Sequence, residues 1–570
     1  MAERTGADIL VECLQAEGIK DVFGVIGSAC IDITDAIART PGMRFIPTAH
    51  EQGAAYAADG YARITGKPAV CLVTVGPGAT NALSGVAQAY MESSPVILIS
   101  GEVASTVRGK GRSNWHEIDQ LEVFKPITKN TLRLERVERI PELMRQAFRT
   151  ATSGRQGPVY LGVPREVQTA LSDVPVPAAA AYRAAARPRA DAATVVQAAD
   201  LIQKAKNPLV LAGGGVIWSG AREALLKLME LLAIPGAATP SHKGIIPDDH
   251  PLGLGQLGHT GSPPAQRYAQ ETDLILAIGC TFSETTTDRY GYHILPKRAG
   301  IIHIDIDPEE IGKSYPVDVG IVGDARSVIE DLTRELRNRG LVPPNLSLHG
   351  RVQKVAELKK SWREQFHALT AEGEGRIRRA HVIQAVRQAL DHDAIVVSEA
   401  GGTCSFTRFA FEAYHPYLIP GDFSAMGSGY CMSLGAKAAY PERQVLSISG
   451  DGAMMMVLPE ILTAVENNIP SVAVVIHNNI YSNIKHKQDV LFGKRFIGVD
   501  HPYPSFAKMA REFGAWGESV EQEPELLPAI QRALASGKPA IVEVFIDPTD
   551  RVPPSKTYKR WVEERQMPVV

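Results

Sequence analysis

Two polar motifs, each at the end of a short apolar run, constrain this chain more than any other feature of its sequence. Residues 445–449 are apolar and rich in strand-forming side chains, and they lead into Gly-Asp-Gly at 450–452. Residues 472–476 have the same character and lead to Asn-Asn at 478–479. Residues 459–468 between them have apolar side chains at helical spacing, which predicts a strand–helix–strand unit with parallel strands. Both motifs are then expected at the carboxyl edge of one sheet, where open α/β sheets bind ligands.

The residue types at this edge fit a small, hard cation. Asp451 offers a carboxylate, Asn478 a side-chain carbonyl, and Ile480 a main-chain carbonyl. Mg²⁺ prefers an octahedral set of oxygen ligands, and water with two phosphate oxygens of a diphosphate would complete the set. The sequence therefore predicts a Mg²⁺ site with Asp451, Asn478 and Ile480 as its protein ligands.

These motifs resemble the metal and diphosphate motif of the thiamine-diphosphate (ThDP) enzymes, and two further segments carry the resemblance. Residues 48–63 are similar to the glutamate-bearing segment of that family, and residues 75–81 to its next loop. The similarity covers essentially the whole chain and is greatest to the acetolactate synthase and pyruvate oxidase branch. It implies ThDP and Mg²⁺ as cofactors and Glu51 as the residue that activates ThDP.

The resemblance also assigns roles to other residues. The Glu51 carboxyl group would favour the imino form of the aminopyrimidine ring, which can take the C2 proton of the thiazolium. Met426 stands where the family places an apolar side chain that folds the two cofactor rings together. His116 and His486 are candidates for proton transfer because they fall in loops expected to face the cofactor. The remaining predicted cofactor contacts are Gly27, Pro77, Asn81, Gly401, Gly402, Thr403, Gly452, Ala453 and Tyr481.

Alternating helical and strand patterns predict an α/β protein with three doubly wound parallel-sheet domains. The predicted domains are a pyrimidine-binding domain over residues 1–180, a central Rossmann-like domain over 190–345, and a diphosphate-binding domain over 375–570 that includes a C-terminal tail. An Ala- and Pro-rich stretch at 174–190 is expected to be a linker, and the charged stretch 351–379 is expected to be helical.

The central domain resembles the part of acetolactate synthases that holds FAD. Glycines 213–215 and residues 304–308 carry this resemblance. The arginine that usually follows the strand glycine in that family is missing from residues 279–282. We therefore expect a Rossmann-like domain that does not hold FAD or ADP.

Bulk properties restrict the partners and the compartment. The formal net charge of −3 gives no basic surface for nucleic acid or for an anionic membrane. The six cysteines are scattered without a C-x-x-C pair, no signal-peptide pattern begins the sequence, and no apolar run approaches about 18 residues. We expect a soluble cytoplasmic protein with reduced cysteines.

The substrate-facing segments depart from acetolactate synthases. Ile-Gly-Ser-Ala at 26–29 replaces a Pro-Gly-Gly turn and resembles sulfoacetaldehyde acetyltransferases, and Lys487 replaces a tryptophan. The segment 115–120 ends in Glu-x-x-Gln, as in oxalyl-CoA decarboxylases and 2-hydroxyacyl-CoA lyases. Cations near these segments favour an anionic substrate, such as a sulfonate, phosphate or an acyl-CoA; they are Arg108, Lys110 and Arg112, with Lys556, Lys559 and Arg560 in the tail.

These features lead to one favoured activity and two alternatives. A ThDP-dependent lyase or acyltransferase similar to sulfoacetaldehyde acetyltransferase is expected first. The alternatives are a 2-hydroxyacyl-CoA lyase or oxalyl-CoA decarboxylase, and an acetolactate-synthase-like carboligase acting on 2-oxo acids. The resemblance further implies a homodimer or homotetramer in which Glu51 and the metal motif of different subunits form each active site.

Overall fold

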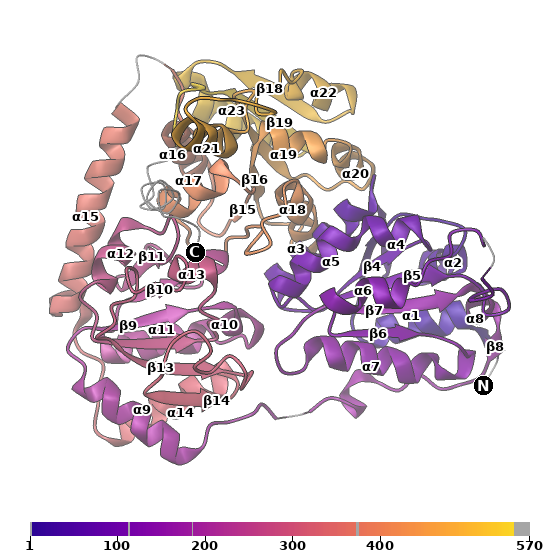
Figure 1. Cartoon of the computed structure of the whole chain (residues 1–570), viewed down its shortest axis with the longest axis horizontal. Coiled ribbons are helices and arrows are strands. Elements are labelled where there is room, and N and C mark those ends of the chain that lie inside the picture. Colours follow the sequence, from indigo (N-terminus) through magenta and orange to yellow (C-terminus); the bar gives the residue numbers. More distant parts are fainter. Residues whose placement is uncertain (1–2, 112–113, 185, 372–375, 552–570) are drawn as a thin grey trace. The chain divides into compact units, whose positions relative to one another are not determined.

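Three parallel β-sheets form the framework of the computed structural model, which describes residues 3–111, 114–184, 186–371 and 376–551 (Figure 1). The protein is therefore of the α/β class with three doubly wound domains. Its residues form two compact units. Unit 1 comprises Met1–Arg187, Cys431–Pro441 and Val457–Ile469, and unit 2 comprises Pro188–Tyr430, Glu442–Met456 and Pro470–Val570.

The sheet of unit 1 has the strand order β3-β2-β4-β5-β7-β6, and its ladders are parallel. Helices α1, α2 and α7 share one apolar core with the sheet, while α3 and α5 pack together and contact it. The strands are β2 (Asp21–Gly24), β3 (Arg44–Pro47), β4 (Ala69–Val73), β5 (Val96–Glu102), β6 (Asn130–Arg133) and β7 (Val159–Pro164). The helices are α1 (Gly6–Ala16), α2 (Ile31–Arg39), α3 (Glu51–Thr65), α4 (Pro77–Asn81), α5 (Leu83–Met91), α6 (Gln120–Phe124), α7 (Ile140–Thr152) and α8 (Arg165–Thr169). A short antiparallel pair joins β1 (Arg4–Thr5) to β8 (Leu171–Ser172).

The central sheet lies in unit 2 and has the order β11-β10-β9-β12-β13-β14, which is the strand order of a Rossmann fold. Its strands are β9 (Pro208–Ala212), β10 (Gly236–Ala238), β11 (Gly253–Gln256), β12 (Leu274–Ile278), β13 (Gly300–Asp305) and β14 (Val319–Val322). Its helices are α9 (Ala192–Lys204), α10 (Gly214–Trp218), α11 (Arg222–Leu232), α12 (Pro263–Ala269), α13 (Glu284–Thr287) and α14 (Ala325–Asn338).

Helix α15 (Gly350–Ala371) follows the central sheet, contacts α12 and β11, and is the long helix at the edge of unit 2 in Figure 1. The prediction of one helix over 351–379 is wrong at its end, because residues 376–378 are not helical and the next helix begins at Arg379. The segment predicted as a linker, 174–190, contains only the short turn Ala179–Ala181 in its described part before α9 begins.

The third sheet has the order β15-β16-β17-β19-β18 with parallel ladders. Its strands are β15 (Ile395–Ser398), β16 (Val445–Gly450), β17 (Val472–His477), β18 (Trp516–Val520) and β19 (Ala540–Phe545). Its helices are α16 (Arg379–Ala389), α17 (Gly402–Ala410), α19 (Asp451–Met456), α21 (Ser482–Phe492), α22 (Phe506–Glu512) and α23 (Glu523–Ala535). Helix α20 (Glu460–Glu466) and the larger part of α18 (Ser428–Ala439) belong to unit 1. The strand–helix–strand unit predicted from the sequence is present, since β16 and β17 are parallel neighbours with Gly450 opposite Ile476.

Close packing in unit 1 joins α3 to part of α18. A Cβ atom built on Gly60 of α3 would lie 2.6 Å from the Cα of Met432 and would also overlap the Met432 carbonyl oxygen. Gly60 is therefore required by the approach of two backbones rather than by its own conformation. None of the described helices is both long and apolar enough to cross a membrane.

This packing predicts that Gly60→Ala destabilises the protein. Alanine is the better helix former by about 1 kcal/mol, so helix propensity alone predicts a small gain. The overlap with the Met432 backbone reverses that sign, because neither backbone can move without disturbing the core. We expect Gly60→Ala to lower the thermal unfolding temperature by several degrees in a calorimetric scan. Gly350→Ala is the control, since its Cβ would meet no atom within 4 Å; equal unfolding temperatures for the two variants would contradict the packing argument.

Candidate functional site

Asp451 joins the ends of two neighbouring strands. It is the first residue of α19, directly after β16, and Asn478 directly follows β17. One carboxylate oxygen of Asp451 accepts hydrogen bonds from the N–H groups of Asn478 (2.9 Å) and Asn479 (2.6 Å), and the other accepts from Gly452 N–H (2.7 Å). Burial raises the pKa of Asp451, and these three N–H groups oppose that shift. A bound cation would favour the ionised carboxylate further.

Asn478 and Ile480 place two more oxygens at this edge. The side-chain oxygen of Asn478 lies 3.2 Å from the carbonyl oxygen of Ile480 and accepts a long hydrogen bond (3.3 Å) from Ile480 N–H. Two acceptor oxygens that face each other are explained either by a turned amide group or by a cation between them. The three predicted ligands are all hard oxygens, so the residues present fit Mg²⁺. Among the described residues no cluster of three His, Cys, Asp or Glu side chains offers a different kind of metal site.

Tyr481 and Thr403 lie beside the same strand ends. A Cβ atom on Gly452 would come within 2.8 Å of the Tyr481 ring, so the glycine allows the ring to lie against the start of α19. Gly450 is in van der Waals range of the Thr403 hydroxyl, at 3.5 Å from a Cβ built on it. Gly401 has a φ of +79° and precedes the first residue of α17. Of the predicted cofactor residues in unit 2, Gly452, Tyr481 and Thr403 therefore lie at this edge, Gly401 precedes α17, and Ala453 is buried in α19.

Glu399 connects the loop after β15 to the start of α18, shortly after Met426. It was not identified from the sequence. It follows β15 and is fully buried, and its carboxyl oxygens accept hydrogen bonds from the N–H groups of Ala400 (2.8 Å) and Gly429 (2.9 Å). Burial raises the pKa of Glu399 to about 7, against hydrogen bonds from backbone N–H groups and from Ser449 that lower it. The signal in the sequence was a glutamate at a strand end before a glycine pair.

A buried ion pair between His477 and Glu543 contacts the Asn478–Asn479 turn through the Asn479 side chain. His477 Nδ1 lies 2.7 Å from a Glu543 carboxylate oxygen, and Nε2 lies 2.9 Å from the Asn479 side-chain oxygen. Both partners are acceptors, so both ring nitrogens donate and the ring is an imidazolium. Burial lowers the pKa of His477, but the bonds to Glu543 and Asn479 outweigh it and raise the pKa above its usual value. Burial raises the pKa of Glu543, yet bonds from His477, Ser505 and Ser519 bring it to about 2.

Glu51 lies in unit 1 at the start of α3 and is 8% exposed. One of its carboxylate oxygens accepts a hydrogen bond from the Asn81 side chain at 2.9 Å. The other oxygen would lie 3.1 Å from a Cβ atom on Gly78, and that Cβ would also crowd Thr74. Gly27 packs against the same threonine, and Pro77 begins α4 in the same loop. The predicted residues Glu51, Gly27, Pro77 and Asn81 therefore form one cluster at the carboxyl edge of the unit 1 sheet.

Two further residues position this cluster and were missed from the sequence. Glu460 of α20 accepts hydrogen bonds from the backbone N–H groups of Ala49 (3.2 Å) and His50 (3.0 Å), directly before Glu51. Burial raises the pKa of Glu460. Gln120 accepts a hydrogen bond from Gly76 N–H at 2.8 Å and donates to the hydroxyl group of Tyr160 at 2.9 Å. Glu460 could not be placed from the sequence because its partners lie about 410 residues earlier in the chain.

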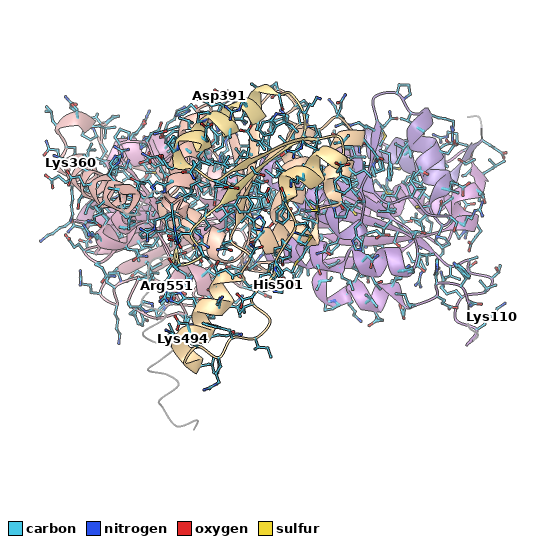
Figure 2. The ribbon with its side chains drawn as sticks, turned by 90° about the horizontal axis from the view of Figure 1, so that it is seen from above. Lys110, Lys360, Asp391, Lys494, His501 and Arg551 are labelled. Carbon is cyan, nitrogen blue, oxygen red and sulfur yellow. The ribbon has the colours of Figure 1, made fainter. Side chains whose placement is uncertain are left out.

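The predicted proton-transfer histidines and the predicted cations lie in different places. His116 has a left-handed φ of +61° and its carbonyl group borders Gly76, so it lies beside the Glu51 cluster. His486 lies in α21, where burial and then Arg551 lower its pKa. Burial and then Arg289 lower the pKa of Lys487. Arg108 forms an ion pair with Glu135 at 3.7 Å, and Lys110 lies on the exposed loop labelled in Figure 2. Arg112 and the tail cations Lys556, Lys559 and Arg560 lie outside the described residues.

The glycines of the central domain have a packing role. A Cβ on Gly213 would lie 2.8 Å from the backbone of Cys280, and one on Gly215 would lie 2.6 Å from the Cα of Gly279. Close approach of these two strand-end loops therefore accounts for the glycine run that resembles a nucleotide site.

Glu399 predicts a pH dependence of stability. Its folded pKa of about 7 lies above the ordinary value of 4.5, so the folded protein binds this proton more tightly. The stabilising contribution is complete below about pH 4.5 and is lost as the pH rises through 7, with a total of about 3 kcal/mol. In Glu399→Gln this group cannot titrate. We expect unfolding temperatures of the wild type to fall more steeply between about pH 5 and about pH 8 than those of the variant; parallel curves would contradict the assignment.

Comparison with known proteins identifies the family. Three family models match this chain: the N-terminal TPP binding domain of thiamine pyrophosphate enzymes at residues 4–123, their central domain at 195–332, and their C-terminal TPP binding domain at 399–544. Thiamine pyrophosphate is another name for ThDP. The chain is 35% identical over 570 residues to a probable acetolactate synthase large subunit of Methanocaldococcus jannaschii, covering 96% of this chain and 93% of the relative.

Two bacterial relatives have similar coverage. The chain is 33% identical over 565 residues to the acetolactate synthase large subunit of Haemophilus influenzae, covering 97% and 96% of the two chains. It is 33% identical over 555 residues to the acetolactate synthase isozyme 1 large subunit of Escherichia coli, covering 96% and 95%. With three matching domain models and full-length relatives above 30% identity, the chain belongs to the thiamine pyrophosphate enzymes.

Proposed function

We propose that the protein is a ThDP- and Mg²⁺-dependent carboligase of the acetolactate synthase type that acts on 2-oxo acids. The observation that carries the proposal is that the chain has both the Glu51 cluster and the Asp451 edge and is similar along its length to acetolactate synthase large subunits. The Glu51 cluster supports cofactor activation, and the edge formed by Asp451, Asn478 and Ile480 supports a metal–diphosphate site.

The reaction would break one carbon–carbon bond and form another. The bond between the carboxylate and the carbonyl carbon of a first 2-oxo acid breaks with release of CO₂. A new bond then joins that carbonyl carbon to the carbonyl carbon of a second 2-oxo acid, with uptake of one proton. When bound, ThDP would supply the nucleophilic carbon and the electron sink that this chemistry needs.

The residues of this chain would bind and orient the cofactor and its cation. Asn81 donates to one oxygen of Glu51, and the oxygen beside Gly78 would be the one that exchanges a proton with a bound cofactor. Asp451, Asn478 and Ile480 would hold the cation, which would offset the negative charge of the diphosphate. Glu399 holds the backbone at Ala400, in the loop after β15, and at Gly429, shortly after Met426. We propose further that Glu51 of one subunit works with the metal motif of another in a homodimer or homotetramer.

The relatives favour the carboligase over the activity first expected from the sequence. Residues 26–29 and Lys487 led to a sulfoacetaldehyde acetyltransferase-like enzyme, but the relatives reported above are acetolactate synthases. The half-buried Lys487 near Arg289 still favours an anionic group on the substrate. A 2-oxo acid carboxylate and a sulfonate both satisfy that requirement, so sulfoacetaldehyde is the second candidate.

The test measures both products with ThDP and Mg²⁺ present. From pyruvate we expect acetolactate and CO₂, and no sulfite from sulfoacetaldehyde with phosphate. Glu51→Gln should lower kcat by about 10²- to 10⁴-fold because the proton exchange is lost while the side chain keeps its shape. Glu138→Gln, which changes an exposed glutamate of the same domain, is the control and should leave kcat unchanged.

Other results would reject the proposal. Sulfite release without acetolactate formation would reject the carboligase in favour of the second candidate. Full activity of Glu51→Gln would remove Glu51 from the mechanism, whichever substrate is used.

A further inference from the structure

We propose that Asp550 and Arg379 are positioning residues for the cation site and that they act through Ser482 to orient the side-chain amide of Asn478. The proposal rests on the proposed function for the cation itself. It adds Asp550, Arg379 and Ser482, none of which belongs to the motifs that predicted the site.

A buried ion pair forms the base of this arrangement. Arg379 begins α16, and its side chain is 3% exposed, while that of Asp550 is 6% exposed. Arg379 Nη1 donates to the Asp550 carboxylate (3.0 Å) and to its main-chain carbonyl (2.7 Å), and Arg379 N–H donates to the same carboxylate (3.1 Å). Arg378 adds a second positive charge beside Asp550 at 3.3 Å. A charge pair with this many hydrogen bonds holds the guanidinium group in one orientation.

The guanidinium group is bonded to Ser482 on its other side. Arg379 Nη2 donates to the Ser482 hydroxyl oxygen at 2.9 Å, and Asn478 Nδ2 donates to the same oxygen at 2.9 Å. Ser482 begins α21. Arg551, which follows Asp550 and is labelled in Figure 2, pairs with Asp489 of the same helix at 2.8 Å. Asp550 therefore holds the start of α21 through Arg379, while Arg551 contacts the later part of the same helix.

The hydroxyl group of Ser482 can accept from Arg379 and from a second donor at the same time. Ser482 can therefore accept from the Asn478 NH₂ group when a cation holds the Asn478 oxygen beside Ile480, whereas without a cation its O–H can donate to that oxygen instead. When the NH₂ group faces Ser482, the Asn478 oxygen faces the opposite way, toward the Ile480 carbonyl oxygen at 3.2 Å. This is the orientation in which Asn478 and Ile480 can share a cation. The turned amide would instead accept from Ser482 (2.9 Å) and Arg379 (3.3 Å) and would remove one ligand from the cation.

The orientation of an amide ligand is a known function of groups behind a metal site, and removing such a group typically costs 10- to 100-fold in metal affinity. Ser482→Ala removes the acceptor for the Asn478 NH₂ group. We expect the dissociation constant for Mg²⁺, measured by titration calorimetry at a fixed ThDP concentration, to rise about 10- to 100-fold. Ser482→Thr keeps the hydroxyl group and should restore the affinity to within a few-fold of the wild type.

Turnover gives a second readout. At saturating Mg²⁺ the kcat of Ser482→Ala should return close to that of the wild type, because the variant weakens binding of the cation rather than the reaction. Ser536→Ala removes a hydroxyl group that donates to the Ala533 carbonyl oxygen and accepts from Lys538 N–H at the end of α23; it is the matched control and should leave Mg²⁺ affinity unchanged.

A double variant tests whether Asp550 acts through the serine. Asp550→Asn should weaken Mg²⁺ binding in the wild type, but it should add little in the Ser482→Ala background, since residues that act through one another are not additive. Asp393→Asn, which breaks the exposed Asp393–Arg443 pair, is the control for the change of charge.

The outcomes separate this proposal from the proposed function. Wild-type affinity in Ser482→Ala, with Mg²⁺ bound by both proteins, would overturn the positioning role and leave the cofactor site standing. Independent, additive losses from Asp550→Asn and Ser482→Ala would overturn the route through Ser482. Failure of the wild type to bind Mg²⁺ with ThDP would overturn the cation site, and this proposal with it.

Discussion

The hydrogen bonds from two consecutive backbone N–H groups to the Asp451 carboxylate are the interaction on which the candidate site depends. They are possible because β16 and β17 are parallel neighbours, so that the residues after each strand meet at one edge of the sheet. A buried carboxylate is costly without such partners. Here the partners are supplied by the turn that also carries Asn478 and Ile480, so the same bonds place the predicted cation ligands side by side.

Charges held inside unit 2 support this turn on two sides. The His477–Glu543 pair fixes Asn479, and the Arg379–Asp550 pair fixes Ser482, which bonds to Asn478. Both pairs are buried and hydrogen-bonded, and in such a pair removal of one partner is far more costly than its net contribution. The Glu51 cluster of unit 1 is built in a similar way, with Glu460 and Gln120 bonding to the backbone on either side of it.

The sequence predicted those parts of the site whose residues are close together in the chain. The α/β class and the strands before Asp451 and Asn478 follow from local patterns, and the roles of Glu51 and Asn81 follow from the resemblance of residues 48–63 and 75–81 to the segments of the ThDP enzymes. Asp550 could not be predicted, because its partner Arg379 lies 171 residues away and neither belongs to a motif. Glu460 was missed for the same reason. The end of the helix predicted over 351–379 was wrong because the charged residues Arg376 and Arg378 do not have helical backbone.

The most direct test of the account is the position of the cation. Crystals grown with ThDP and Mn²⁺ would show the metal by its anomalous scattering, without reference to activity. We expect one metal ion in contact with the Asp451 carboxylate, the Asn478 side-chain oxygen and the Ile480 carbonyl oxygen, with the Asn478 NH₂ group directed to Ser482. A structure with ThDP bound but no metal at these oxygens, or with the Asn478 oxygen turned to Ser482 and Arg379, would contradict it.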